Sequence, residues 1–220
     1  MPRAQARIDL SAYARNLAAL RALAPNSQQM AIVKADAYGH GLLPMAQAAR
    51  DAGTEWLGVA LFNEALELRA NGDPGPILAW LASPEDPWAE VAEARIDLGI
   101  STAAQLERLT TFARVHLKID TGLGRAGCAP ADWPALIELA KRKQDAGQID
   151  VVGIWSHFTV ADEPTNPLNM VQIERFREAA QAAEILDVEH LHLANSAANL
   201  ALPDAHFTLV RPGIATYGIS

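Results

Sequence analysis

Cysteine is nearly absent from the sequence: Cys128 is the single cysteine among 220 residues. One cysteine excludes a disulfide bond within the chain and is typical of proteins in a reducing compartment, so we expect a cytoplasmic protein. The six histidines and this cysteine do not have the spacing of a zinc finger, and we therefore expect no metal centre.

Long apolar runs and excess positive charge are also missing. No segment reaches the roughly 18 consecutive apolar residues of a membrane-spanning helix, and residues 1–16 have no apolar core of a secretory signal. The net charge of −8 argues against nucleic acid as the main partner, because phosphate backbones attract basic surfaces. We therefore expect small-molecule partners, with no membrane and no nucleic acid among them.

Hydrophobic residues make up 50% of the chain, enough for a sizeable core in one large domain or two small ones. Short, mainly apolar runs recur, and each is followed by a turn and a helical pattern. Such runs are typical of strands buried on both faces of a parallel sheet. The eight predicted strands span residues 30–35, 56–61, 76–81, 96–101, 114–120, 151–157, 190–195 and 208–214.

The segments between the strands carry helix signals. Ser11 and Asn63 are good N-cap residues, and Thr102 with Gln105 has the spacing of a capping box. The clearest helical patterns cover residues 11–24, 42–53, 63–71, 133–146 and 167–186. The first of these would precede the first strand.

Eight strands that alternate with helices predict a (β/α)8 TIM barrel, formed as one domain by residues 1–220. An open, doubly wound sheet is the alternative. It is less favoured because no GxGxxG turn follows the first predicted strand. The sequence stops just after the eighth strand without a closing helix, so we expect a longer protein.

Residues 31–41 read AIVKADAYGHG and place Lys34 at the C-terminal end of the first predicted strand. Reactive groups of such barrels gather at these strand ends. Lys34 either extends its amine to solvent or keeps a partly desolvated amine that can form a Schiff base, because burial disfavours the ammonium form. Tyr38 follows four residues later, and Gly39 and Gly41 would let the backbone approach a ligand.

The fifth predicted strand leads into LKIDTGLGRAG, residues 117–127. Lys118 lies inside this apolar strand, where a lysine that is neither paired nor modified is costly. Arg125 offers a planar fork of donors for a carboxylate or a phosphate, although a surface ion pair is an equally good interpretation.

Histidines occur on the sixth and seventh predicted strands. His157 falls at the C-terminal edge of the sixth, where it is a ligand contact, an orienting group or a structural histidine. His190 and His192 share one face of the seventh, but they lie in its N-terminal half, away from the expected active end. No third ligand accompanies this pair, so a metal site is not expected there.

The loops after strands seven and eight form the phosphate site of many barrels of this kind. The hydroxyl of Ser196 and the backbone N–H groups near Gly213 and Ile214 would suit a phosphate. Arg211 lies next to them, at the mouth of the predicted barrel.

Together these segments resemble the N-terminal barrel domain of the pyridoxal phosphate (PLP)-dependent alanine racemases, over essentially the whole chain. AIVKADAYGHG matches the family's cofactor-lysine motif closely, and KIDTGLGRAG, SHFTVADE, NSAAN and RPGIATYG follow in order. The resemblance implies a PLP-binding (β/α)8 barrel and an isomerase that converts L-alanine to D-alanine for peptidoglycan. It also implies a homodimer in the full-length form.

The resemblance implies a role for each residue that holds the cofactor. Lys34 carries PLP as a Schiff base and serves as one of two bases that move the α-proton. Tyr38 contacts the phosphate, and Ser196 binds it together with the backbone of Gly213 and Ile214.

Four further roles follow from the resemblance. Arg211 faces the pyridine nitrogen of the cofactor, and His157 supports Arg211. Arg125 holds the substrate carboxylate and the cofactor's ring oxygen. Lys118 matches a position that is a carbamylated lysine in many members, where it steadies Arg125.

The chain departs from the family pattern in one respect. The family's second base is a tyrosine from a C-terminal β-domain of the partner subunit, whereas the tyrosines here are Tyr13, Tyr38 and Tyr217. We therefore expect the 220 residues to be part of a longer racemase with little activity alone. A non-catalytic, single-domain PLP-binding barrel of cofactor homeostasis is the alternative, and serine could replace alanine as the substrate.

Overall fold

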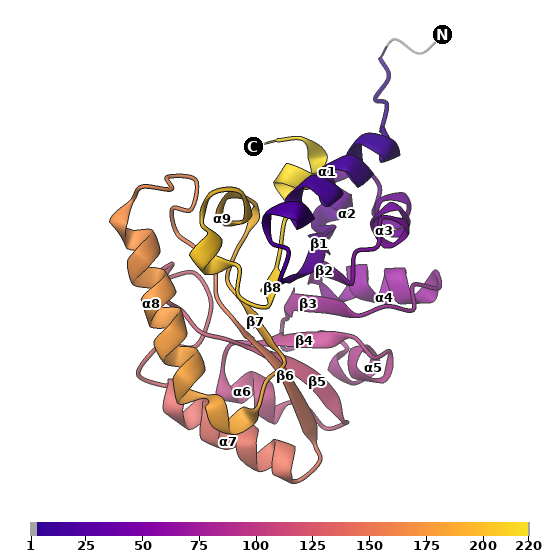
Figure 1. Ribbon diagram of the computed structural model, residues 1–220. Helices are drawn as coiled ribbons and strands as arrows, with labels where there is room; N and C mark the ends of the chain where they lie inside the picture. The colour runs from indigo at the N-terminus through magenta and orange to yellow at the C-terminus, as the bar shows by residue number, and fades with distance from the viewer. Residues whose placement is uncertain (1–3, 220) are drawn as a thin grey trace.

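A computed structural model describes residues 4–219, so the two ends of the predicted 1–220 domain lie outside the described residues. The chain is a (β/α)8 TIM barrel, as the sequence predicts (Figure 1). Its strands are β1 (Gln28–Ile32), β2 (Trp56–Leu61), β3 (Ile77–Leu81), β4 (Asp97–Ile100), β5 (Ala113–Lys118), β6 (Ile149–Trp155), β7 (His190–His192) and β8 (Leu209–Val210).

The strands are all parallel and follow the order β7-β6-β5-β4-β3-β2-β1-β8. Two backbone hydrogen bonds connect the outer pair: the Thr208 N–H donates to Leu191 O (3.1 Å) and the Arg211 N–H to Ala194 O (3.0 Å). The sheet is therefore a nearly closed barrel, with its C-terminal strand ends at one mouth.

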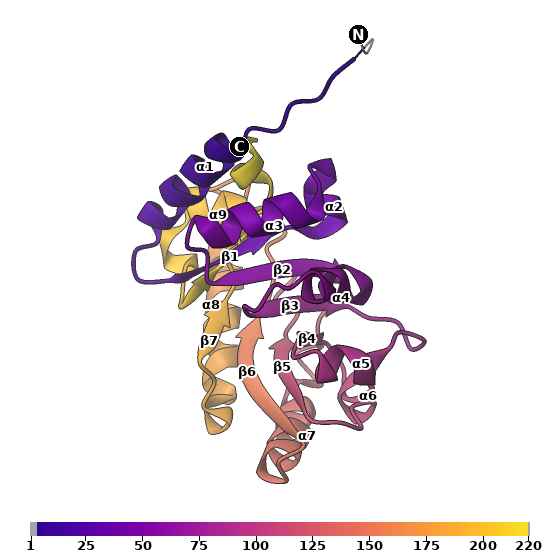
Figure 2. The same cartoon turned by 90° about the vertical axis from the view of Figure 1, so that its right-hand side faces the viewer.

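Helices and short 3₁₀ turns surround the sheet (Figures 1 and 2). The α-helices are α1 (Leu10–Leu23), α2 (Lys34–Gly39), α3 (Leu42–Asp51), α4 (Phe62–Ala70), α5 (Trp88–Glu93), α6 (Ala103–Glu107), α7 (Trp133–Asp145), α8 (Pro167–Ala182) and α9 (Ser196–Ala201). The 3₁₀ turns are η1 (Glu184–Leu186), η2 (Pro203–Ala205) and η3 (Ile214–Tyr217). Within residues 4–219, no helix is both long enough and apolar enough to span a bilayer.

The predicted helix caps have mixed outcomes. The Thr102 hydroxyl accepts from the Gln105 N–H (3.2 Å), as the capping box predicts. Asp9, not Ser11, caps α1, since its carboxylate accepts from the Ala12 N–H (2.9 Å). The prediction for Asn63 was also wrong, because α4 already begins at Phe62 and Asn63 lies inside it.

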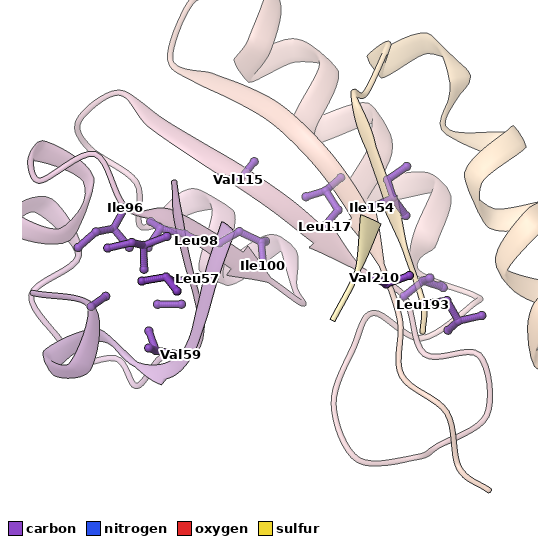
Figure 3. Packing of buried hydrophobic residues seen from close by; sticks show 14 of the residues in the cluster. Leu57, Val59, Ile96, Leu98, Ile100, Val115, Leu117, Ile154, Leu193 and Val210 are labelled. Atoms are coloured by element: carbon purple, nitrogen blue, oxygen red, sulfur yellow. The ribbon is translucent and has the colours of Figure 1, made fainter. Parts of the chain in front are cut away.

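The main apolar core lies between the sheet and the helices. Figure 3 shows Leu57 and Val59 of β2 clustered with Leu98 and Ile100 of β4. A second, smaller cluster contains Met30, Ile32, Trp56, Leu78, Val152 and Leu209, with Tyr38 and Trp80 packed against it. Large side chains need room, and Gly153 provides it, because a Cβ there would lie 2.5 Å from the His116 ring.

Lys34 is placed differently from the prediction. The first strand ends at Ile32, so Lys34 does not belong to the strand but opens α2 two residues later. Lys34 still lies at the barrel mouth, where the chain leaves the sheet.

Candidate active site

A cavity of about 590 Å³ opens at the C-terminal ends of the strands. It brings together every residue that the sequence singles out as a site residue. These lining residues are Lys34, Tyr38, Lys118, Arg125, His157, Ser196, Arg211, Gly213 and Ile214. Trp80 and Trp155, which the sequence did not indicate, also line the wall.

The turn after Lys34 has an uncommon backbone. Ala35, Asp36, Ala37 and Tyr38 all have φ between 52° and 54°, in the left-handed region. Each such residue costs roughly 1–2 kcal/mol because Cβ crowds the following carbonyl oxygen. Strain of this kind clusters at functional sites, and here it lies directly beside the cavity lysine.

The amine of Lys34 is partly desolvated. Burial lowers the pKa of Lys34, the positive charge of Arg125 lowers it further, and the carboxylate of Glu64 opposes both effects. A lowered pKa increases the fraction of free amine at neutral pH, and the free amine is the nucleophilic and basic form.

Tyr38 is fixed by its contacts with η3. A Cβ at Gly213 would lie 2.4 Å from the Tyr38 hydroxyl, so only glycine lets this hydroxyl come so close to the η3 backbone. The ring of Tyr217 lies 5.0 Å from the Tyr38 ring, and its hydroxyl donates to Ile32 O (3.0 Å). Tyr38 therefore presents its hydroxyl at a defined corner of the cavity.

This corner suits an anion. The Ser196 hydroxyl oxygen accepts from the N–H groups of Gly213 (2.8 Å) and Ala215 (3.2 Å). The N–H of Ile214, between them, makes no hydrogen bond within residues 4–219. Two hydroxyls and a free backbone donor, packed around a glycine, are the chemistry that a phosphate group requires.

Arg211 lies at the cavity floor and is only 5% exposed. Its guanidinium donates to Ser156 O (2.7 Å), to Leu193 O (3.3 Å) and to Nδ1 of His192 (3.1 Å). Burial lowers the pKa of Arg211 to about 9, and the group stays a cation at neutral pH. His157, the expected support, lines the same cavity but makes none of the hydrogen bonds that hold Arg211 in residues 4–219.

The position of His192 corrects a sequence-based expectation. We expected it to lie away from the active end, yet it contacts Arg211 from inside the barrel. Because Arg211 can only donate, Nδ1 of His192 accepts, and the proton of this ring is on Nε2. His192 Nε2 lies 2.8 Å from His116 Nδ1, and His116 Nε2 lies 3.2 Å from Oδ2 of Asp97.

The hydrogen-bonded chain therefore has one direction, from Arg211 to Asp97. Burial and the charge of Arg211 keep the pKa of His192 well below its usual value, so its ring stays neutral. Arg114 continues the chain to Asp150, with N–O distances of 3.1 Å and 3.2 Å to the two carboxylates. Two arginines and two aspartates balance one another across the barrel.

Lys118 faces the same floor and is 4% exposed. Its amine lies 4.4 Å from the centroid of the Trp155 ring, and the Arg211 guanidinium lies 5.1 Å from that centroid. Burial, Arg211 and Arg125 lower the pKa of Lys118 to about 8. Burial and neighbouring cations, first Arg211, also lower the pKa of His157 to about 3, which leaves it neutral.

The fold and the cavity define a class: a TIM barrel with a partly desolvated lysine at its mouth, an anion corner and a buried arginine. The sequence matches the family described as "Alanine racemase, N-terminal domain" over residues 8–220. The chain therefore belongs to the alanine racemase N-terminal domain family.

Two curated relatives are named alanine racemase. The alanine racemase of Streptomyces coelicolor is 51% identical over 99% of this chain and 59% of its own length. That of Thermobifida fusca is 48% identical over 99% of this chain and 60% of its own length. The crystal structure of the Streptomyces lavendulae alanine racemase superposes with a TM-score of 0.94, at 49% identity over 97% of this chain and 58% of that one. The chain thus spans about 60% of the length of the curated relatives it matches.

Proposed function

We propose that this chain forms the cofactor-binding barrel of a PLP-dependent alanine racemase. The observation that carries the proposal is that the Lys34 amine and the anion corner open onto one cavity. A phosphate and an aldehyde at the two ends of one small molecule would meet these two groups. The relatives' activity on alanine supports the choice of substrate.

Different residues around the cavity would bind different parts of the cofactor. Tyr38, Ser196 and the backbone at Gly213 and Ile214 would bind its phosphate, and Arg211 would be the cation beside its ring. When bound, PLP withdraws electrons from the substrate and so makes the α-proton easier to remove. The Arg211 guanidinium stays charged and is fixed by acceptors in the barrel floor, so it cannot supply a proton readily.

Lys34 is the proton-transfer group on one face of the substrate. Its lowered pKa increases the fraction of free amine, the form that can accept the α-proton. Racemisation also needs a donor on the opposite face, and Tyr38 is the one tyrosine that lines the cavity among residues 4–219. Because Tyr38 belongs to the anion corner, we propose that the second base comes from a second subunit in a homodimer.

Arg125 would bind the substrate carboxylate, and Lys118 would steady it. The free amine of Lys118 can add to carbon dioxide and release a proton, which leaves a carbamate. Such a carbamate would place negative charge between Arg125 and Arg211, the two cations that lower the pKa of Lys118.

Covalent capture tests the central assignment. The chain is incubated with PLP and reduced with borohydride, and the modified lysine is located by peptide mass spectrometry. We expect the adduct on Lys34 and its loss in Lys34→Ala. An adduct on another lysine, or none, would remove the basis of the proposal. Conversion of L- to D-alanine by the protein that carries this barrel tests the substrate.

A further inference from the structure

Glu64, in the first turn of α4, binds two separate segments with one carboxylate. Its Oε1 accepts from the Ala35 N–H (2.5 Å), immediately after Lys34. Its Oε2 accepts from the N–H groups of Ala60 (2.9 Å) and Leu61 (2.8 Å), at the end of β2. The second set is an ordinary helix cap. The first is not needed for capping α4.

The bond to Ala35 lies where the backbone most needs support. A left-handed turn of four residues without glycine persists only when its surroundings hold it. At the far end, the carboxylate of Asp36 accepts from the Leu42 N–H (2.7 Å). At the near end, Val33 offers α2 no side-chain cap, and Glu64 is the group that binds the first residue of the turn.

We propose that Glu64 is a positioning residue for Lys34: its carboxylate ties the left-handed turn to β2 and so fixes where the lysine leaves the sheet. The inference rests on the proposed function only in that Lys34 is the cofactor lysine. The tie itself is a property of the chain without cofactor.

The tie requires two acceptor oxygens, and this makes Glu64→Gln a selective change. An amide has one acceptor oxygen and one NH₂ group. The single acceptor oxygen of the substituted side chain gains more by facing the two donors of Ala60 and Leu61, so the NH₂ group would face the Ala35 N–H. The variant therefore keeps the cap of α4 and loses the bond to the turn. Glu67→Gln is the matched control, because Glu67 lies one turn later on the same helix and is exposed.

Hydrogen exchange of the cofactor-free chain is the first measurement. Ala35 is an exposed residue, yet its amide should exchange slowly in the wild-type chain. In Glu64→Gln we expect this exchange to accelerate about tenfold, the scale of a lost charge-assisted bond, while the Leu61 amide keeps its protection. Glu67→Gln should leave both amides unchanged. Fast exchange of Ala35 in the wild-type chain would itself overturn the proposal, even if Glu64→Gln fails to fold.

The second measurement is the rate at which PLP becomes reducible on Lys34, followed across pH. At high pH, where Lys34 is a free amine in both chains, we expect about tenfold slower capture in Glu64→Gln. The pH midpoint should move down, because the Glu64 charge that raises the pKa of Lys34 is gone. A charge effect alone would shift the midpoint and leave the high-pH rate unchanged, and that result would contradict the positioning role.

The two proposals fail separately. Absence of a Lys34 adduct in the wild-type chain would remove the proposed function, while the exchange of Ala35 would still decide whether Glu64 holds the turn. The positioning role alone would be removed if the wild-type chain captures PLP on Lys34 and Glu64→Gln captures PLP and exchanges its Ala35 amide at the same rates as the wild type.

Discussion

At the scale of single residues, the cavity shifts several ionisable groups toward their neutral forms. Lys34, Lys118 and His157 all have lowered pKa values, and burial is the first cause in each case. The adjacent cations Arg125 and Arg211 act in the same direction. Burial and this positive charge thereby increase the fraction of free amine at both lysines.

Carbamate formation on Lys118 is a prediction at this scale. With ¹³C-labelled carbon dioxide we expect one carbamate signal in the NMR spectrum of the chain. At a fixed concentration of dissolved carbon dioxide, the signal should grow as the pH rises through about 8, because the free amine replaces the ammonium.

Two variants check the assignment of this signal. Lys118→Ala should abolish it, and Lys143→Ala should keep it, because Lys143 lies on the surface helix α7. A signal that survives in Lys118→Ala would place the carbamate elsewhere.

At the scale of elements, the anion corner depends on how η3 packs against α2. Gly213 lies in η3's N-cap position, and the Tyr38 hydroxyl fills the space where a Cβ would be. The contact joins a segment near the start of the chain to one near its end. The geometry of the corner is therefore decided by packing between distant elements.

Gly213→Ala tests this contact. The added methyl group would displace the Tyr38 hydroxyl, and we expect about tenfold weaker PLP binding in a spectroscopic titration. Tyr38→Phe should also weaken binding, since it removes the same hydroxyl. In a double-mutant cycle we expect the double variant to be little worse than either single one, because directly contacting residues are not independent. Strictly additive losses would show that the two residues act separately.

At the scale of the whole molecule, a buried polar chain crosses the barrel from Arg211 through His192 and His116 to Asp97. A buried guanidinium needs a negative charge to compensate it. The hydrogen-bonded chain connects the Arg211 guanidinium to the carboxylate of Asp97, which carries that charge. The two histidine rings continue the chain, because each ring donates with one nitrogen and accepts with the other.

Asp97→Asn, compared with Asp150→Asn, tests this balance. Both carboxylates pair with Arg114, but the Asp97 side chain is 3% exposed and that of Asp150 is 49% exposed. We expect Asp97→Asn to lower the free energy of unfolding in urea by about 2–3 kcal/mol. Asp150→Asn should change it by less than about 1 kcal/mol, because exposed ion pairs contribute little. Equal losses would contradict a special role for the buried end.

The barrel itself could be predicted because its strands are marked locally. Apolar runs such as 56–61 indicate strands that are buried on both faces, and β2 has the predicted bounds. The strands β7 and β8 were predicted too long, because Asn195 caps α9 instead of extending β7, and past the end of β8 the Arg211 N–H bonds across to Ala194 O. Helix caps were less predictable. Asn63 is a good capping residue, but the carboxylate of the next residue, Glu64, makes the hydrogen bonds that cap α4.

The sequence alone determined the alternation of strands and helices, because periodicity is local, and its short motifs indicated the polar residues at Lys34, Arg125 and Arg211 but not Trp80 or Trp155 in the cavity wall. Only the tertiary structure decided the rest: the left-handed turn after Lys34, the approach of Tyr38 to Gly213, and the contact of His192 with Arg211. It also showed that Glu64 binds the backbone beside Lys34 from another helix. These contacts join residues far apart in the chain, and no local pattern specifies which side chains meet when the barrel closes.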